Sequence, residues 1–448
     1  MSQSRTIVLD NGASTLKVGF ADETEAPKII PNAIIRSKGD KETYFGHEIE
    51  RCTNFASLNY RIPFQKGLLT DWDAQKAIWD GIFSPGLLNV DTSAHSILVT
   101  EPYFNLPNIQ DVYDQMIFEE YEFESYMRCS PASLIPYGTM FKSPEYPHAP
   151  ECMIIVDAGF SFTHVVPLMN GSVVWNAVQR IDVGGKLLTN HLKELVSFRQ
   201  WNMMDETWIV NEIKEACCYV SDDYHRDLET CRVDPKKNPI LQEYILPDFS
   251  SAVTRHGRIR EGPTQDRPKD DDLGDAMKGR DHQRNREQLL LMGNERFAVP
   301  ELLFRPDDVG LDQLGLPRAI ARSISLLPED VRGMFWANVG LVGGSTLFPG
   351  LQQRLTRELR ALAPPECEVM VHTCERPITE AFHAGRALAS SPGVFGQAGN
   401  AIAVTRAEYA EGGSSACRRK FQRWDWHLAG RALKRKASRG GRRRGGAK

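Results

Sequence analysis

The chain has 448 residues, 41% hydrophobic and 25% charged, a composition ordinary for a globular protein of two or more domains. No run approaches 18 consecutive apolar residues and the N-terminus enters a strand pattern at once, so we expect neither a membrane span nor a secretory signal. Nine scattered cysteines without a CxxC favour a reduced intracellular compartment. The net charge of −4 is uneven: residues 418–448 hold 13 Lys/Arg and one Asp, which leaves −16 on residues 1–417 and suits basic partners better than DNA.

In chain order, short apolar runs alternate with helical stretches up to about residue 250. Helices are predicted over 107–123 and 184–197, and the strands are TIVLD (6–10), HSILVT (95–100), MIIVDA (153–158) and VVWNAV (173–178). This alternation predicts an α/β fold. Residues 249–290 are polar, with nine Lys/Arg against eight Asp/Glu, and we expect a disordered surface insertion there. A further strand is predicted at 336–342, and a disordered basic tail over 418–448.

One pattern occurs twice. Residues 6–20 and 153–168 each consist of an apolar, β-branched run ending in Asp, then a small residue and Gly, then a return strand. An Asp at a strand end can hold a hydrated divalent cation, and the adjacent Gly lets backbone N–H groups approach phosphate oxygens. Two such hairpins facing each other would hold a nucleotide between two lobes. In the second copy, Phe160 stands where a polar loop is expected to face the phosphates.

Longer blocks resemble the actin superfamily from about residue 5 to 417. They are GLLTDWDAQKAIWDGIF (67–83), LVTEPYFN (98–105), IKEACCYVSDD (213–223), GNERFAVPELLFRP (293–306), VGGSTLFPGL (342–351) and TRAEYAEGG (405–413). Other blocks resemble a nuclear subfamily of the actin-related proteins: FEEYEF (118–123), VDAGFSFTHVVP (156–167), DVGGKLLTNHLKEL (182–195), MDETWIVNEIKE (204–215) and ILPDFSS (245–251). Matches of this length in the same order are highly specific.

The resemblance implies an actin-like two-lobe fold of duplicated ribonuclease H-like domains, with four subdomains around a central nucleotide cleft. The boundaries that it implies are 1–31, 64–147 and 380–417 for the small-lobe base, 32–63 for a small-lobe tip with a shortened loop, 148–183 and 312–379 for the large-lobe base, 184–311 for the large-lobe tip with its insertion, and 418–448 for the tail.

The resemblance also assigns residues to the nucleotide. Asp10 and Asp157 match the two aspartates around the metal, although no metal site is certain. The other matches are Lys17 for the phosphates, Gly12 and Gly159 for the tight turns, Gly185 for the ribose side, Lys214 and Glu215 for the nucleoside, Gly343 and Gly344 for the adenine, and Leu347 with Phe348 for an apolar wall. Simpler interpretations stay open: strand-end caps for the aspartates, a solvated helix face for Lys214 and Glu215, a strand-to-helix turn for the glycine pair, and core packing for the wall.

The departures from the family pattern concern the chemistry. Ala13 replaces the Ser that contacts the terminal phosphate, and Ser14 stands where Gly is usual. Phe160 replaces an acidic residue that orders the water on the metal, and it would crowd the phosphates. The region 122–136 has no Gln to position the attacking water and offers Ser130 or Pro131 instead. His164 alone favours a structural role. Because each such element contributes about 10²–10⁴-fold, we expect a pseudo-ATPase with no catalytic residue.

Two further expectations concern assembly. The segment 31–46 is shorter than in actin, and the insertion would obstruct the opposite lobe tip, so we expect no homopolymer. In the tail, the basic residues resemble a bipartite nuclear import signal or a nucleic-acid contact, although a solvated tail without a function stays open. They are Lys434, Arg435, Lys436, Arg442, Arg443 and Arg444. Trp424 and Trp426 precede them and could pack the tail onto the body or a partner.

The subfamily resemblance implies a non-catalytic scaffold in the nucleus, and a second location in the cytoplasm stays open. It would be a subunit of a SWR-type chromatin remodelling complex, which exchanges histone two-A for its Z variant and so regulates transcription and chromosome stability. The partners implied are a Snf2-type motor ATPase, accessory subunits, histones or the nucleosome, and DNA through the tail, but no membrane. No cofactor is required, although ATP or ADP with Mg²⁺ held structurally stays open. The alternatives are an active actin-like ATPase or cytoskeletal filament subunit, and a heterochromatin-binding module outside the remodeller.

Overall fold

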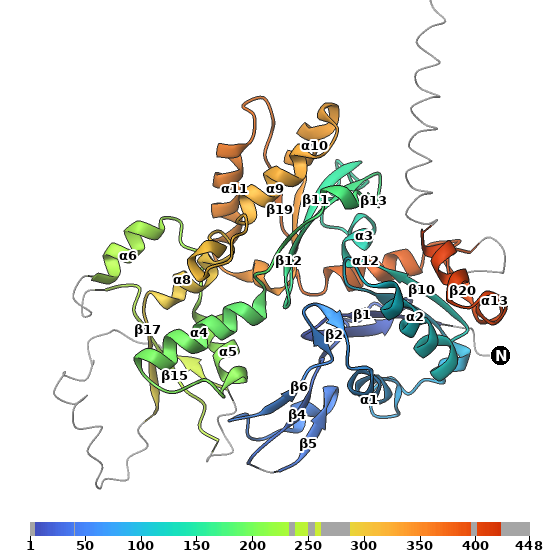
Figure 1. Cartoon of the computed structure of the whole chain (residues 1–448), viewed down its shortest axis with the longest axis horizontal. Helices are drawn as coiled ribbons and strands as arrows, with labels where there is room; N and C mark the ends of the chain where they lie inside the picture. Colours follow the sequence, from blue (N-terminus) through green and yellow to red (C-terminus); the bar gives the residue numbers. More distant parts are fainter. Residues whose placement is uncertain are drawn as a thin grey trace, which may run out of the picture.

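Two mixed β-sheets, each carrying one copy of the hairpin, form the centre of the molecule (Figure 1). The computed structural model describes residues 5–39, 41–232, 238–249, 256–260, 287–395 and 401–422. In both sheets the hairpin is antiparallel and its first strand also pairs with a parallel neighbour. The α/β fold expected from the sequence is confirmed.

The small lobe is built on the first sheet, and its apolar strands are buried on both faces, as β1 shows along most of its length. In spatial order its strands are β20 (Val404–Thr405), β10 (Ser125–Cys129), β9 (Ser96–Thr100), β1 (Thr6–Asn11), β2 (Thr15–Phe20) and β3 (Lys28–Pro31). Its helices are α1 (Trp72–Phe83), α2 (Pro107–Gln115), α3 (Pro131–Leu134), α12 (Glu380–Ala389) and α13 (Arg406–Gly412). Asp71 caps α1 by accepting the Ala74 N–H, which fixes where that helix begins.

The large lobe is built on the second sheet. In spatial order its strands are β13 (Ser172–Val173), β12 (Thr163–Met169), β11 (Cys152–Ala158), β18 (Val339–Val342) and β19 (Val371–His372), with β14 (Gln179–Ile181) also paired to β12. Its helices are α4 (Gly185–Arg199), α5 (Thr207–Cys217), α6 (Tyr224–Arg232), α8 (Glu295–Glu301), α9 (Leu316–Ser325), α10 (Arg332–Trp336) and α11 (Leu351–Leu362). One apolar core runs through this lobe from the sheet to the helices.

Each lobe also carries a small sheet at its tip. The small-lobe tip pairs β5 (Thr43–Phe45), β4 (Ile34–Arg36) and β6 (Asn59–Arg61) around its own apolar cluster. The large-lobe tip pairs β16 (Arg258–Ile259), β15 (Gln242–Ile245) and β17 (Leu289–Met292). A short hairpin, β7 (Phe64–Gln65) and β8 (Leu68–Leu69), follows the small-lobe tip in the chain. Figure 1 shows the two tips on the same side of the molecule.

The structure corrects the prediction that residues 249–290 are a disordered insertion. Residues 256–260 are ordered and contribute β16, because their charges find partners: Arg258 lies 2.9 Å from Glu287, and His256 lies 2.6 Å from Glu212. Phe249 packs at the small-lobe tip, with its ring 6.4 Å from that of Phe55. Residues 250–255 and 261–286 lie outside the described residues.

Three other boundaries differ from prediction. Residues 414–422 are helical, so the first five residues of the predicted disordered tail are ordered, and the buried Phe421 packs its ring 5.5 Å from that of Tyr126. The predicted strand 173–178 stops at Val173, because the Val174 carbonyl accepts the Ala177 N–H and starts a 3₁₀ turn, η5 (Trp175–Ala177). The strand predicted over 336–342 begins only at Val339. Among the described residues, no helix has the length and apolar composition to span a bilayer.

Candidate functional site between the two hairpins

The first hairpin brings Asp10 and Lys17 together. They are cross-strand partners in the β1–β2 register, both are buried, and the Lys17 Nζ lies 3.3 Å from the Asp10 carboxylate. The Thr100 hydroxyl donates to the same carboxylate at 2.8 Å. A Cβ on Gly12 would lie 2.7 Å from the Thr15 carbonyl oxygen, so the turn requires glycine. Beyond it, Ala13 and Ser14 form the tip of the hairpin, where a phosphate would meet the Lys17 ammonium.

In the second hairpin the Asp157 carboxylate already has a protein partner. The Tyr103 hydroxyl donates to it at 2.8 Å and accepts the Ala132 N–H at 3.1 Å. Burial raises the pKa of Asp157 to about 6, the Tyr103 hydrogen bond opposes this rise, and the negative charge of Asp10 adds to it. Burial also raises the pKa of Tyr103 well above its ordinary value, so its hydroxyl keeps its proton. Among the described residues, no three His, Cys, Asp or Glu side chains are grouped as metal ligands.

Phe160 lies at the start of α4, beside the glycine expected to face a ribose. A Cβ built on Gly185 would lie 3.7 Å from Phe160 Cδ2 and 3.8 Å from the Lys214 Nζ. The first N–H groups of α4 are also taken, since Gly185 donates to the Gly159 carbonyl at 3.0 Å and Lys186 donates to the Phe160 carbonyl at 2.9 Å. The hairpin itself therefore fills this helix terminus. Of the groups matched to the nucleotide, Lys17 offers a cation for phosphate oxygens, whereas Phe160 takes up space beside Gly185.

The residues matched to the nucleoside are held by neighbouring side chains. The buried Lys214 Nζ donates to Thr189 at 3.0 Å and to Asn211 at 2.8 Å, while Glu215 accepts from Asn211 at 2.8 Å. Burial lowers the pKa of Lys214, and the negative charge of Glu215 partly opposes this. The solvated face considered for this pair is therefore wrong for Lys214, which links α4 and α5 through these bonds.

On the side matched to the adenine, Gly343 directly follows β18 and has a backbone conformation that requires glycine. Its φ is +92°, and a Cβ would lie 2.5 Å from the Ala158 carbonyl oxygen, so the backbones of two strands touch here. Gly344 opens the turn η10 (Gly344–Leu347). Leu347 is 53% exposed and free to meet a ligand, whereas Phe348 belongs to the large-lobe core.

The candidate groups for activating water are not placed for that role. His164 pairs with Asp157 across the hairpin, and burial lowers its pKa to about 3, which leaves a weakly basic neutral ring. Its ring lies 4.5 Å from that of Tyr103, the packing of a structural residue. Ser130 directly precedes α3, and its carbonyl accepts the Ser133 hydroxyl at 2.6 Å. Sequence reasoning missed Tyr103, although the residue lies in the quoted block LVTEPYFN.

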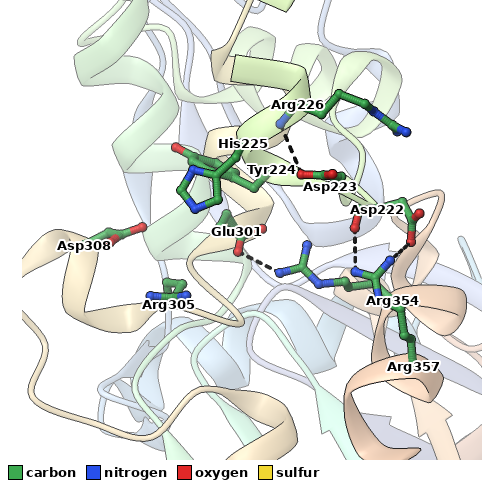
Figure 2. A pocket seen from close by; sticks show the side chains of 10 residues that line it. All are labelled: Asp222, Asp223, Tyr224, His225, Arg226, Glu301, Arg305, Asp308, Arg354 and Arg357. Atoms are coloured by element: carbon green, nitrogen blue, oxygen red, sulfur yellow. Dashed lines mark hydrogen bonds and ion pairs between the residues drawn. The ribbon is translucent and has the colours of Figure 1, made fainter. Parts of the chain in front are cut away.

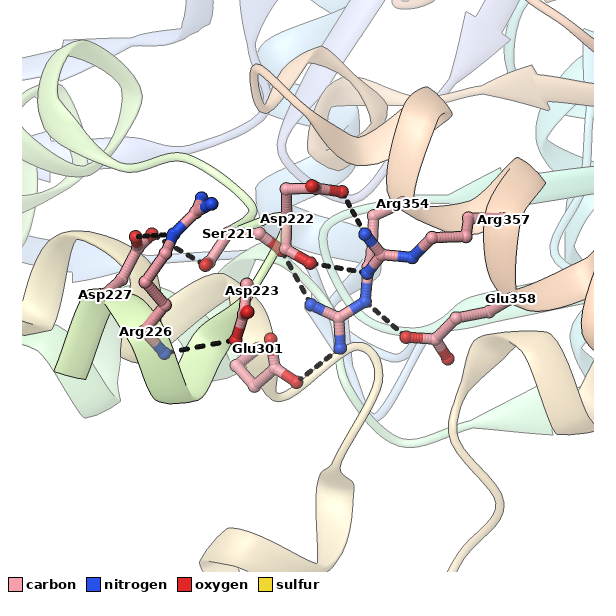
Figure 3. Close-up of polar contacts among 9 residues, drawn as sticks. All are labelled: Ser221, Asp222, Asp223, Arg226, Asp227, Glu301, Arg354, Arg357 and Glu358. Carbon is pink, nitrogen blue, oxygen red and sulfur yellow. Dashed lines mark hydrogen bonds and ion pairs between the residues drawn. The ribbon is translucent and has the colours of Figure 1, made fainter. Parts of the chain in front are cut away.

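A second polar site lies in the large lobe, where sequence analysis predicted none (Figure 2). A cavity of about 420 Å³ lies among α6, α8 and α11. Its charged side chains mainly pair with each other: Arg354 reaches Glu301 at 3.1 Å and Arg357 reaches Asp222, as Figure 3 shows. These pairs tie α11 to α8 and to the loop before α6, which indicates a structural network.

Comparison with known proteins agrees with this fold. The family described as Actin matches residues 1–422. The chain is 50% identical to "Actin-like protein ARP6" of Cryptococcus neoformans, over 94% of this chain and 85% of that protein. It is 37% identical to "Actin-related protein 6" of Drosophila melanogaster (86% and 93%) and 36% identical to that of Arabidopsis thaliana (93% and 99%). With its two-lobe α/β fold, the chain therefore belongs to the actin family.

Proposed function

We propose that this chain is a non-catalytic, actin-related scaffold subunit of a SWR-type chromatin remodelling complex in the nucleus. Its neighbours there are the Snf2-type motor ATPase, accessory subunits and the histones of a nucleosome whose histone two-A is exchanged for the Z variant. The names of its relatives support the subfamily. The acidic body formed by residues 1–417 supports basic partners such as histones. The basic residues from Lys434 to Arg444, proposed for import or DNA, lie outside the described residues.

One observation carries the non-catalytic assignment. The Tyr103 hydroxyl donates to the Asp157 carboxylate, and the Phe160 ring packs beside Gly185, the glycine matched to the ribose side. Both matched residues, Asp157 and Gly185, therefore already have protein neighbours. The remaining polar groups of the hairpins can bind and orient a ligand. His164, however, has a pKa of about 3 and is therefore a poor general base at neutral pH. The protein therefore needs no nucleotide turnover, and a nucleotide with Mg²⁺, where retained, is structural.

A phosphate-release assay on the isolated chain, with actin alongside, tests this proposal. We expect release at the level of a Lys17→Ala control, which removes the cation beside the buried Asp10 and whose melting temperature checks that it folds. Turnover like that of actin, lost in Lys17→Ala, would establish an actin-like ATPase instead. Melting with 1 mM ATP and Mg²⁺ tests retention, because a Kd of 10 µM or below would add about 2.7 kcal/mol or more.

Affinity purification from nuclear extract tests the assembly. We expect a Snf2-type ATPase and histones to be recovered with the chain, and chains carrying Phe160→Asp to recover the same set. Recovery without any motor ATPase would favour the heterochromatin module that acts outside the remodeller. Filament formation in a sedimentation assay would contradict both nuclear assignments.

A further inference from the structure

The three-stranded sheet at the large-lobe tip ends in a very short edge strand. β16 (Arg258–Ile259) pairs with β15 (Gln242–Ile245) at two register positions. Because β15 spans four residues, a longer strand could pair with more of it. An extended peptide can add to a sheet edge of this kind, and its backbone hydrogen bonds then supply affinity. The edge of β15 is therefore suited to binding a peptide strand.

Acidic side chains surround this edge and hold the segment 256–260 by its basic residues. The three carboxylates, which we call the edge carboxylates, are Glu212 of α5, Glu243 of β15 and Glu287. Arg258 lies 2.9 Å from Glu287. Arg260 lies 2.9 Å from Glu243 and 3.8 Å from Glu287. His256 lies 2.6 Å from Glu212. Within the described part of the chain, the edge carboxylates thus form their ion pairs with this one segment.

The segment 256–260 also shows which sequence the edge accepts. Side chains alternate along an extended chain, so its two arginines share one face and both reach Glu287. Ile259, on the other face, packs against the apolar core of the large lobe. At Gly257 a Cβ would lie 2.3 Å from Cε1 of the buried Tyr244 ring, so this place requires glycine. The accepted pattern is glycine, basic, apolar, basic in an extended conformation.

The chain's own segment is held weakly enough to be replaced. The side chains of His256, Arg258 and Arg260 are 66%, 62% and 42% exposed. Exposed ion pairs contribute little stability, because water and salt screen their charges. A partner strand with the same pattern over more residues would gain backbone pairs along β15 that the two residues of β16 do not make.

We propose that the edge of β15 binds an extended basic segment of a protein partner, which adds to the sheet as a strand in place of residues 256–260. The basic residues of the partner meet the edge carboxylates, its glycine passes Tyr244, and its apolar residue takes the place of Ile259. Backbone pairing then gives affinity, and the alternating side chains give specificity. Neither the hairpins nor a motor subunit takes part, so this site can fail while the proposed scaffold role holds.

Peptide binding to the full chain tests the proposal. The probe is a fluorescent peptide with the sequence of residues 256–260, His-Gly-Arg-Ile-Arg. Arg258→Ser with Arg260→Ser removes ion pairs of the chain's own segment, and we call this double change the opened variant. It should bind the probe at least about tenfold more tightly than the unaltered chain, in which the edge is mostly occupied. Gly257→Ala, whose added Cβ meets Tyr244, opens the edge in a second way and should shift binding in the same direction.

Charge controls locate the binding. Glu212→Gln, Glu243→Gln and Glu287→Gln, added to the opened variant, should weaken binding at least about tenfold, because each exposed ion pair contributes up to about fivefold. The matched control removes the same net charge from three exposed positions elsewhere, by Glu145→Gln, Glu329→Gln and Glu366→Gln. It should change binding by no more than about twofold, since salt screens distant charges. Melting temperatures check that the variants fold.

Two altered peptides separate strand addition from attraction by charge alone. One has N-methylarginine in the place of Arg260, whose N–H donates to the Glu243 carbonyl at 3.0 Å. The other carries the change that corresponds to Gly257→Ala. Both keep the charge of the probe, and both should bind the opened variant at least about tenfold more weakly. Equal binding of all three peptides would overturn the proposal, as would opened and unaltered chains that bind the probe equally.

Discussion

The tips of the two lobes are joined directly by side chains. The ring of Phe55 stacks on that of Trp208 with centroids 4.8 Å apart and planes at 22°. Beside this stack, the Ser57 N–H and hydroxyl donate to the Glu206 carboxylate at 2.9 and 2.8 Å. These four residues connect the small-lobe tip to α5 and the segment before it. We predict that the contact holds in solution without nucleotide.

A double-mutant cycle measures the coupling free energy between Phe55 and Trp208. Phe55→Leu and Trp208→Leu each remove one ring, and an aromatic pair contributes about 0.5–1.5 kcal/mol beyond the burial of its area. We therefore expect a coupling free energy of about 1 kcal/mol, while each single change also loses packing of its own. The assay is native-state amide exchange at residues 43–61, which reports the free energy of opening of the small-lobe tip.

The control cycle pairs Phe55→Leu with Phe198→Leu, since the side chain of Phe198 is 93% exposed. Sites that do not touch add within about 0.3–0.5 kcal/mol, so this cycle should show no coupling. If the Phe55–Trp208 cycle were equally additive, the lobes would be apart in solution and the direct closure inferred from the structure would be wrong. ATP with Mg²⁺ should leave the measured coupling unchanged.

Three further predictions concern the hairpins. Phe160→Asp should not restore phosphate release above background, because the water-positioning Gln is also missing, and measurable turnover would show that loss to be unimportant. The pKa of Asp157 is about 6 in the folded protein and 3.8 as its ordinary value, so between these two pH values the folded protein binds more protons than the unfolded chain. The native protein should therefore lose stability as pH rises through this window. Asp157→Asn should remove up to about 3 kcal/mol of that loss in unfolding free energy. Denaturant unfolding of both proteins at pH 4 and pH 7 checks the sign. A difference in unfolding free energy between variant and unaltered protein that does not change with pH would contradict this prediction. Gly343→Ala should cost at least about 2 kcal/mol in the same assay because its φ is +92°, whereas Gly310→Ala, with a φ of +78° but nothing near the added Cβ, should cost less.

The hairpins were predictable because their signals are local. The apolar run, the terminal Asp and the Gly specify strand, turn and return strand within 15 residues, and the Asp10–Lys17 register follows from the turn length. The same holds for α4, predicted over 184–197 and found at Gly185–Arg199. Local patterns therefore located the elements that carry the candidate site.

What decides the chemistry of the site was not local. Tyr103 precedes Asp157 by 54 residues, and only the fold brings its hydroxyl to that carboxylate. Similarly, the polar composition around Arg258 predicts disorder, yet a strand forms there because Tyr244 and Ile245 offer a free edge and Glu287 offers an ion-pair partner. Composition reports the average tendency of a segment, while a few tertiary partners determine whether part of it orders.

The contacts between the lobes bear on why a member of this family could lose turnover and keep its shape. In a two-lobe protein whose lobes meet mainly through a ligand, shape depends on ligand occupancy. Here the lobes also meet through protein groups: Tyr103 on Asp157, the Phe162 ring against Gly67, and Phe55 on Trp208. A Cβ on Gly67 would lie 2.6 Å from that ring, so the approach is as close as glycine allows. In the scaffold role proposed above, closure that rests on side chains would persist through the nucleotide cycle of a neighbouring motor, and a scaffold between moving subunits requires this property.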